Sequence, residues 1–483
     1  MSNTDKCTHN ITNYEFVAFS GDLEDLHQTH TEQVRREEEQ IYFDEYALEE
    51  LNNVAPRYYD QHIKGWARSW YTGSQHLKTV MQYAQADTPL HQLDQDIYSQ
   101  AVQATRDGFR SLPIVRALSV KTDLDKVKFV QSSAAGYGYQ GVKGPINELN
   151  HKRAIKRAKA TLYSALAEDG EGIDYAIRES VPDVGYTRTQ LTDLTEKTKV
   201  RSVWGRAFHY ILLEGTSARP LLEAIANSDC FIVIGQDPIT AVPRILSDTA
   251  RTSKWLTAVD WSRFDATVSR FEINTAFQLM KERITFPDFD TEMAFELCRL
   301  LFIHKKIAAP DGKVYWSHKG IPSGSYFTTL VGSIVNRIRI EYLWRLKFGE
   351  GPTSCYTLGD DSLIGYDSYY SPTEMSSRCA DLGWIINPEK TECSTYAGGV
   401  TFLGRTSRGF FNERDLKKCI RLLILPEYPV PSGEISAFRA ASIAEDAGGA
   451  GQYINDIAKR LKRKFGIARE EALPKYFRKY QFV

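Results

Sequence analysis

The seven cysteines of this 483-residue chain are odd in number and scattered, and no two of them form a C-x-x-C pair. A disulfide framework or a zinc site needs paired or closely spaced cysteines, so the sequence indicates neither. No apolar run reaches the length of a membrane-spanning helix, and the first residues lack the charged and apolar regions of a secretory signal. We therefore expect a soluble protein of a reducing compartment inside the cell.

The chain also lacks a large excess of either charge, since 60 Lys and Arg stand against 61 Asp and Glu. Phosphate binding depends on the local distribution of charge rather than on its sum. The segment HKRAIKRAKA, residues 151–160, holds five Lys or Arg and no acid. It is either a solvated helix face or a nucleic-acid contact. Its candidate RNA-binding residues are Lys152, Arg153, Lys156 and Arg157.

No internal repeat and no long low-complexity linker interrupts the chain, and 42% of its residues are apolar. This composition is typical of a folded protein with a sizeable core and interlocked subdomains. Short β-rich pieces alternate with helical ones between Lys199 and Val259, which predicts a mixed α/β body. Residues 1–100 predict a helical N-terminal extension, and the residues after Gly433 predict further helices.

Two acidic clusters each follow a predicted strand. The apolar strand Trp255–Val259 leads to Asp260, and Asp265 follows as the chain turns toward a helix. The segment SCYTLGDDSLIGY predicts a hairpin with Asp360 and Asp361 at its turn. Asp and Gly favour turns for backbone reasons alone, so the letters GDD in isolation indicate no more than a turn.

Burial of the apolar flanks of both clusters in one sheet would bring Asp260, Asp360 and Asp361 together. Close carboxylates repel one another, and cations offset that repulsion. Oxygen ligands of this type suit Mg²⁺ or Mn²⁺ rather than zinc. Two such ions on either side of a phosphate can activate an attacking oxygen and stabilise a leaving one. The clusters therefore predict a catalytic site for nucleotide addition.

Five segments in this part of the chain resemble, in order, the palm motifs of viral RNA-dependent RNA polymerases. They are DWSRFD, GIPSGSYFTTLVGSIVN, LGDDS, LGWIINPEKTE and VTFLGR. The resemblance assigns catalytic and metal-binding roles to Asp260, Asp360 and Asp361, and a place facing the ribose to Asp265. Single segments are weak signals, but their shared order makes the set specific. The Gly-Tyr-Gly sequence of an upstream loop and the length of the chain are most similar to those of partitivirus polymerases.

Two upstream segments are similar to further motifs of this family. KTKVRSVWG, within residues 197–206, resembles the nucleotide-entry motif, in which Lys199 and Arg201 would contact the incoming triphosphate. The planar donor fork of an arginine matches phosphate oxygens, although both side chains would also suit an ordinary strand edge. SSAAGYGYQGVKG, residues 132–144, resembles the loop that guides the template. Its candidate RNA-binding residues are Ser133, Gly136 and Gly138.

The last two palm-like segments supply further candidates. Lys390 follows Asn387-Pro388, so it is either a turn residue or a general acid for the departing pyrophosphate. The resemblance places Phe402 and Leu403, in VTFLGR, among the residues that support the growing RNA strand.

The second palm-like segment predicts nucleotide-binding residues at the start of a long helix. Ser323 and Gly324 suit a helix cap whose backbone N–H groups point at the site, and Thr328 follows. Many relatives place Asn or Asp nine residues after this serine, but Gly332 stands there in this chain. Ribose selection would then depend on Asp265 with Ser323 or Thr328, or on Asn336. A helix that faces the ribose would tolerate Asn at position 332.

The resemblance implies an α/β (α+β) right-hand architecture, with fingers at residues 101–250, a palm at 251–408 and a C-terminal thumb at 409–483. It implies RNA, nucleoside triphosphates, two Mg²⁺ or Mn²⁺ ions and a viral capsid protein as partners. It also implies no membrane contact and a location in the virion interior or the host cytoplasm. The alternatives are a reverse transcriptase, which typically has a bulky aromatic in place of Asp265, and an inactive RNA-binding virion protein.

Overall fold

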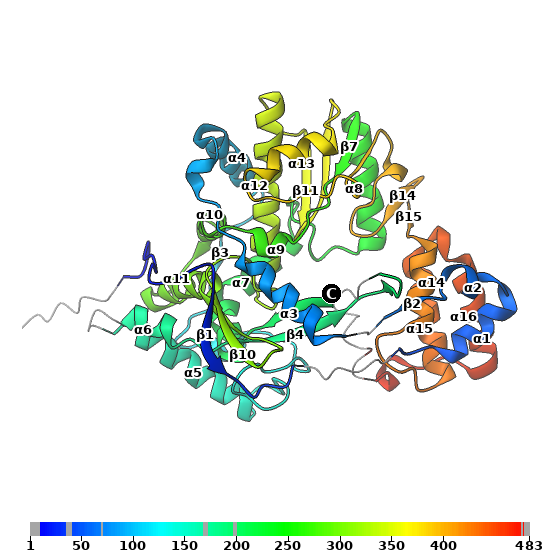
Figure 1. Cartoon of the computed structure of the whole chain (residues 1–483), viewed down its shortest axis with the longest axis horizontal. Coiled ribbons are helices and arrows are strands. Elements are labelled where there is room, and N and C mark those ends of the chain that lie inside the picture. Colours follow the sequence, from blue (N-terminus) through cyan, green and yellow to red (C-terminus); the bar gives the residue numbers. More distant parts are fainter. Residues whose placement is uncertain are drawn as a thin grey trace, which may run out of the picture.

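Two larger sheets and a lateral group of helices organise the chain (Figure 1). The computed structural model describes residues 10–34, 41–68, 71–167, 172–196, 200–474 and 477. Within these ranges, no helix is both long enough and apolar enough to cross a membrane.

A four-stranded antiparallel sheet carries both acidic clusters. Its strands, in spatial order, are β11 (Ser354–Leu358), β12 (Asp361–Tyr366), β7 (Trp255–Ala258) and β13 (Glu392–Ser394). Side chains alternate between the faces of a strand, so Leu363 and Ile364 join different apolar clusters. Helix α12 (Thr328–Phe348) lies on the Ile364 side, and α8 (Pro238–Thr252) lies on the Leu363 side (Figure 1). The sheet is therefore buried between helices, with its strand ends free.

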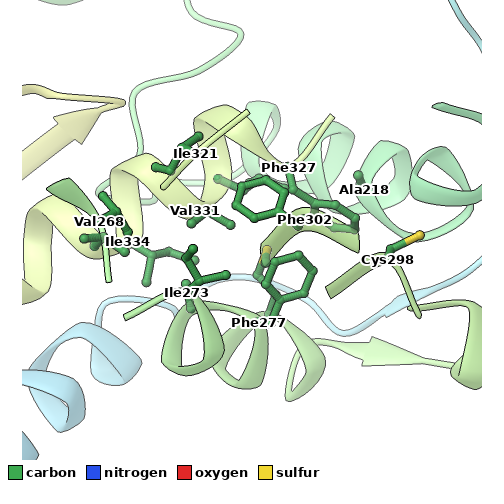
Figure 2. Packing of buried hydrophobic residues seen from close by; sticks show 14 of the residues in the cluster. Ala218, Val268, Ile273, Phe277, Cys298, Phe302, Ile321, Phe327, Val331 and Ile334 are labelled. Atoms are coloured by element: carbon green, nitrogen blue, oxygen red, sulfur yellow. The ribbon is translucent and has the colours of Figure 1, made fainter. Parts of the chain in front are cut away.

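Helix α12 is buried over most of its length in the largest apolar cluster. Figure 2 shows Val331 and Ile334 of α12 facing residues such as Ile273 and Phe277. The helices that contribute to this cluster are α7 (Phe208–Ala226), α10 (Arg270–Lys281), α11 (Phe289–Ile303) and α12. Close packing on several sides fixes the position of α12 beneath the strand ends.

A buried ion pair adds a directional link to this packing. The Arg339 guanidinium of α12 donates to both carboxylate oxygens of Glu272 in α10, at 2.7 and 2.8 Å. It also donates to the Thr267 hydroxyl at 3.1 Å. Because both charges are fully buried, loss of one partner would leave the other uncompensated. The pair therefore fixes the register of α12 against the segment that follows Asp265.

A second, five-stranded sheet lies below the first sheet in the view of Figure 1. Its strands, in spatial order, are β1 (Leu23–Thr29), β10 (Lys313–Ser317), β9 (Lys305–Ala308), β4 (Asp183–Thr189) and β6 (Val200–Gly205). The neighbouring helices α5 (Leu149–Ala165) and α6 (Gly172–Arg178) pack against one another, and α5 also packs against α7. This sheet carries β6, which contains Arg201.

The first hundred residues are divided between these units. Helices are present as predicted, but β1 is a strand at the edge of the five-stranded sheet. Helices α1 (Glu45–Val54) and α2 (Tyr58–His62) instead join the C-terminal helices in one apolar cluster. Those helices are α14 (Leu416–Ile424), α15 (Gly433–Ala447) and α16 (Gln452–Phe465). The buried Asp44 carboxylate ties both parts together, since it accepts from the Ser436 hydroxyl at 2.7 Å and from Arg439.

Shorter elements complete the described chain. They are β2 (Trp66–Ala67), α3 (Gly73–Met81), α4 (Gln95–Asp107), β3 (Val115–Arg116), β5 (Thr192–Asp193), α9 (Phe264–Thr267), β8 (Ile284–Thr285), α13 (Pro372–Ala380), β14 (Thr406–Arg408) and β15 (Phe411–Glu413).

Two buried histidines should make the fold sensitive to acid. Burial lowers the pKa of His76 to about 4, and it lowers the pKa of His318 to about 4 despite the Glu24 carboxylate beside the ring. A histidine in the unfolded chain titrates near ~6.5, so the unfolded state binds more protons between that pH and the folded pKa. Stability should therefore be fully present above this window and fall as the pH drops through it.

Urea unfolding is measured from pH 7.5 down to pH 5, values that lie on either side of the pKa of about 6.5 of a histidine in the unfolded chain. His76→Gln should flatten the fall in unfolding free energy, by at most about 1.4 kcal/mol per pH unit. The solvent-exposed His91 offers a matched control, His91→Gln, which should keep the wild-type slope. An unchanged slope in His76→Gln would contradict the assignment.

Candidate active site

A two-residue turn places two carboxylates at the end of the four-stranded sheet. Leu358 pairs with Asp361 across β11 and β12, so Gly359 and Asp360 form the connection. Gly359 has a φ of +61°, which a glycine adopts without strain at the first central position of a type II′ turn. The GDD segment is a turn, as its letters indicate, and the turn exposes Asp360 and Asp361.

Asp260 comes to the same edge from the neighbouring strand. β7 and β12 are antiparallel with Tyr366 opposite Trp255 and Ile364 opposite Thr257. Continued by the same register, Asp361 lies opposite Asp260. The Asp260 backbone is held in place by the fourth palm-like segment: its N–H donates to the Thr391 hydroxyl at 3.1 Å, and its carbonyl accepts from the Asn387 N–H at 2.9 Å.

Asp360 is the electrostatic centre of the site, because its charge acts on three other carboxylates. Burial and then the Asp360 charge raise the pKa of Asp260, while the Lys390 ammonium opposes the shift. Desolvation and then Asp360 raise the pKa of Asp265, which is half-buried, to about 7. Asp361 is accessible to solvent, yet the protein around it limits the hydration of its carboxyl group. This desolvation, followed by Asp360 and Asp260, raises the pKa of Asp361 to about 6.

The donor set fits a hard divalent cation, because it consists of carboxylate oxygens that repel one another. In the described part of the chain, no three His, Cys, Asp or Glu side chains already form a closed ligand cluster. Mg²⁺ does not require such a cage, since it usually keeps several waters and binds one or two carboxylates together with substrate phosphates. Asp260, Asp360 and Asp361 can therefore hold the ion implied by the sequence.

Helix α12 approaches the turn closely at Gly332. A Cβ atom at this position would lie 3.3 Å from the Gly359 Cα and 3.8 Å from the Phe264 ring. One turn of helix thus packs against the backbone that carries Asp360. A side chain at position 332 meets the turn first, so tolerance of Asn there requires the Gly359 backbone to move by a few tenths of an ångström and stays a prediction.

Two further α12 side chains bond the turn. The Ser333 hydroxyl accepts from the Gly359 N–H at 2.8 Å. The Asn336 amide donates to the carbonyls of Gly359 and Asp361 at 3.0 and 3.2 Å. Its oxygen accepts from the Trp261 indole at 2.8 Å. Asn336 is fully buried by these contacts, so its amide does not face a nucleotide.

The loop before α12 is joined to the five-stranded sheet. The Ser323 hydroxyl accepts from the Trp204 N–H of β6 at 3.1 Å. Only glycine fits next to it, since a Cβ on Gly324 would lie 2.1 Å from the Trp204 carbonyl oxygen. The Thr328 hydroxyl donates to the Pro322 carbonyl at 2.6 Å. The structure therefore places Ser323, Gly324 and Thr328 together beside β6.

Positive charges from three segments of the chain act on the carboxylates. Arg201 is exposed on β6, and its charge lowers the pKa of both Asp265 and Asp361. Lys390 is exposed in the turn that precedes β13, and its charge lowers the pKa of Asp260. The Lys418 charge of α14 also lowers the pKa of Asp361, although no sequence motif singles this residue out. Lys199 lies outside the described residues.

Aromatic and basic residues join the template-like loop to α5. Tyr139 of the loop lies beside Arg157 and Arg153, whose guanidinium carbons are 4.8 and 5.4 Å from its ring centre. Lys152 and Lys156 are exposed on the same helix.

The small loop residues have structural partners of their own. Gly136 has a φ of +84°, and a Cβ there would lie 2.8 Å from the Ala207 Cα. Gly138 has a φ of +71° and donates its N–H to Glu32 at 3.2 Å. The Ser133 hydroxyl donates to the Val130 carbonyl at 2.7 Å. These contacts fix the loop beside the basic helix.

Phe402 differs from its predicted role. Its side chain is 1% exposed and packs with Leu256 and Leu363 in the cluster beneath α8. Because it is buried in the core, Phe402 supports the loop rather than contacting RNA. Leu403 is partly buried at the turn itself, with a φ of +50°.

The family model described as viral RNA-dependent RNA polymerase matches residues 42–462. The RNA-directed RNA polymerase of Cryptosporidium parvum virus 1 is 31% identical over 162 residues, which cover 32% of this chain and 30% of that protein. The RNA-directed RNA polymerase of Atkinsonella hypoxylon virus is 22% identical over 300 residues, covering 50% and 44%. The chain thus spans less than half the length of these curated relatives, which are partitiviral.

Solved structures show the same fold. The RNA-dependent RNA polymerase of a human picobirnavirus superposes with a TM-score of 0.68 and 16% identity, covering 89% of each chain. Its insertion-loop deletion mutant gives a TM-score of 0.67 and covers 90% of each chain. The predicted right-hand architecture is confirmed by this likeness.

The repulsion around Asp360 predicts a metal-dependent stability. Mg²⁺ should raise the melting temperature, because a cation bound to the folded state offsets the repulsion. Asp360→Asn should melt higher than the wild type without metal, by roughly 2 °C per kcal/mol of relief. The same variant should respond less to Mg²⁺.

Thermal unfolding at pH 8, which is above the pKa of about 7 of Asp265, compares these proteins with and without Mg²⁺. The exposed Asp381 provides the control Asp381→Asn, which should keep the full metal response. If Asp360→Asn melts below the wild type without metal, repulsion does not govern the site.

Proposed function

This chain belongs to the viral RNA-dependent RNA polymerase family, whose model matches residues 42–462, and we propose from that membership that it synthesises RNA on an RNA template. The observation that carries the proposal is the convergence of Asp260 and Asp361 on Asp360 at one sheet edge, with Asp265 of α9 close enough for the Asp360 charge to raise its pKa. A scaffold has no need to keep like charges so close, whereas nucleotide addition does.

Enzymes of this family generally use divalent metal ions, and we assign two Mg²⁺ or Mn²⁺ ions to Asp260, Asp360 and Asp361. When bound, such ions stabilise the developing charge on the attacking and leaving oxygens of a phosphoryl transfer. The carboxylates supply the negative charge that retains the ions. The strand ends and the α12 contacts hold those carboxylates in one place.

The positive side chains act on the triphosphate. In the reaction, the 3′-oxygen of the growing strand forms a bond to the α-phosphorus, and the bond from that phosphorus to pyrophosphate breaks. Arg201 is exposed and near the carboxylates, which suits a bidentate phosphate contact. Lys199, two residues before it, is assigned the same role from the motif. Lys390 lies near Asp260 and would give its proton to the departing pyrophosphate.

Ribose selection falls to Asp265 and its neighbours. The Ser323 hydroxyl accepts from Trp204, which leaves its own hydrogen free to donate. The Thr328 hydroxyl donates to Pro322, which leaves its lone pairs free to accept. Asp265, with a pKa of about 7, can act as acceptor or donor at neutral pH. A site that bonds the 2′-hydroxyl leaves polar groups unpaired when a deoxynucleotide enters, and so rejects it.

The RNA path is proposed to follow the basic face of α5 and the adjoining loop. Exposed lysines and arginines neutralise phosphates, and Tyr139 fixes the loop against two of them. We also propose, from the resemblance of the motifs to partitiviral polymerases alone, a viral capsid protein as a further partner and a location in the virion interior or host cytoplasm. A reverse transcriptase is not favoured, because Asp265 occupies the position of the bulky aromatic that would exclude ribose.

Loss of a metal-binding carboxylate should stop synthesis. Asp260→Asn removes one charge from the site and should lower nucleotide incorporation by about 100-fold or more, because electrostatic groups supply most of the catalysis. Incubation with an unprimed RNA template, Mg²⁺ and labelled ribonucleotides measures it. Asp381→Asn should incorporate at the wild-type rate, and Asp260→Asn should still bind the template. Near-normal turnover by Asp260→Asn would overturn the assignment.

Asp265→Ala should weaken discrimination between sugars. The Michaelis constant for ribonucleotides should rise, and the preference over deoxynucleotides should shrink by about tenfold, the worth of one buried hydrogen bond. Both substrates are measured on the same template. A full wild-type preference in Asp265→Ala would place selection elsewhere.

A substitution at Gly332 distinguishes an effect on sugar selection from an effect on the position of the Gly359 turn. Gly332→Ala should slow incorporation of both sugars equally, because its Cβ meets Gly359 rather than the nucleotide. Gly21→Ala is the matched control, since a Cβ at Gly21 has nothing within 4 Å. A change in sugar preference in Gly332→Ala would show that α12 faces the ribose after all.

A further inference from the structure

Both the nitrogen and the oxygen of the Asn336 amide form hydrogen bonds, and they do so with two separate parts of the site. Its nitrogen donates to the Gly359 and Asp361 carbonyls, and its oxygen accepts from the Trp261 indole N–H. The orientation of the amide is chemically fixed, because a carbonyl can only accept and an indole N–H can only donate. Both amide hydrogens and one lone pair are therefore committed.

Each partner of Asn336 adjoins a metal-binding carboxylate. Trp261 directly follows Asp260, whereas Gly359 and Asp361 flank Asp360. These two segments lie at the ends of different strands and are a hundred residues apart in the chain. The strand register aligns them at the backbone, but β7 itself ends at Ala258, before Asp260 is reached. The Asn336 amide continues the link beyond the end of that pairing.

The Trp261 end of this link is rigid. The indole ring is nearly buried, and its backbone forms a bridge to Ile386. Arg339 lies with its guanidinium carbon 5.5 Å from the ring centre, and Glu272 holds that guanidinium with two hydrogen bonds. Asn336 is therefore held against a ring whose own position is fixed, rather than against solvent.

We propose that Asn336 is a positioning residue that sets the distance between the Asp260 backbone and the Asp360–Asp361 turn. The inference rests on the proposed polymerase function and deepens it. A turn of two residues that carries like charges next to a third charge is pushed apart. Asn336, with Ser333, ties the turn to the same helix that anchors Trp261, and so keeps the three carboxylates at the separation that suits bound ions.

A positioning role and a merely structural role make different predictions. Loss of packing alone would lower the unfolding temperature and leave metal affinity unchanged. Loss of positioning would raise the Mg²⁺ concentration needed for half-maximal stabilisation by about 10- to 100-fold, as for other residues that orient metal ligands. The turnover number should fall with it, while the Michaelis constant for nucleotides should stay near that of the wild type.

The variants are Asn336→Leu, which removes both halves of the link, and Trp261→Phe, which removes only the indole donor. Ile338→Ala is the control, because it opens a cavity in the main apolar cluster, and the period of a helix puts position 338 on the face opposite position 336. Hydrogen exchange of residues 356–363 without metal reports the turn directly. Both variants should speed exchange there, although the Trp261 indole donates to Asn336 and, within the described residues, has no hydrogen bond to the turn itself.

The link also predicts non-additivity. Trp261→Phe should have little further effect on exchange or on Mg²⁺ affinity in the Asn336→Leu background, because its partner is already absent. If Asn336→Leu matches Ile338→Ala in exchange and in Mg²⁺ affinity, the positioning role is overturned. A wild-type protein that fails to incorporate nucleotides would overturn the proposed function instead, while exchange and Mg²⁺ affinity would still decide the role of Asn336.

Discussion

The repulsion among the carboxylates around Asp360 is the constraint on which the site depends. Asp260, Asp265 and Asp361 all have raised pKa values, and the charge of Asp360 contributes to each shift. Carboxylates that repel one another stay close only if the backbone that carries them cannot move apart. The buried α12, its ion pair with α10 and its close approach to the turn supply that resistance.

A second buried network connects the loop that contains Ser323 to the strand that carries Arg201. Glu214 of α7 accepts from the Ser325 hydroxyl and the Tyr326 N–H, each at 2.9 Å, and pairs with Arg206 at 3.0 Å. Arg206 directly follows β6, the strand that carries Arg201. The ammonium of buried Lys305 donates to the Gly320 carbonyl at 2.6 Å, just before the same loop. A shift of β6 would therefore move the loop that contains Ser323.

Features that depend on local pattern could be predicted from the sequence, whereas those that depend on packing could not. Strand ends and a glycine turn placed Asp260, Asp360 and Asp361 at one edge, because alternation and turn chemistry are local. The strand β1 was missed, since its pairing with β10 is almost three hundred residues away. Phe402 was misread because its motif says nothing of burial, and Ser333 and Lys418 carry no signal outside the folded contacts.

Gly332 shows how one departure in sequence can account for several contacts. Without a side chain, α12 comes within 3.3 Å of the turn, measured from an added Cβ to the Gly359 Cα. That approach brings Ser333 to the Gly359 N–H and Asn336 to the carbonyls on either side of Asp360. A residue with a side chain at position 332 could reach toward a sugar, but it would hold the helix away from the turn. In this chain α12 therefore holds the turn that carries the carboxylates, and our proposal assigns discrimination of the sugar to Asp265 and the Ser323 loop instead.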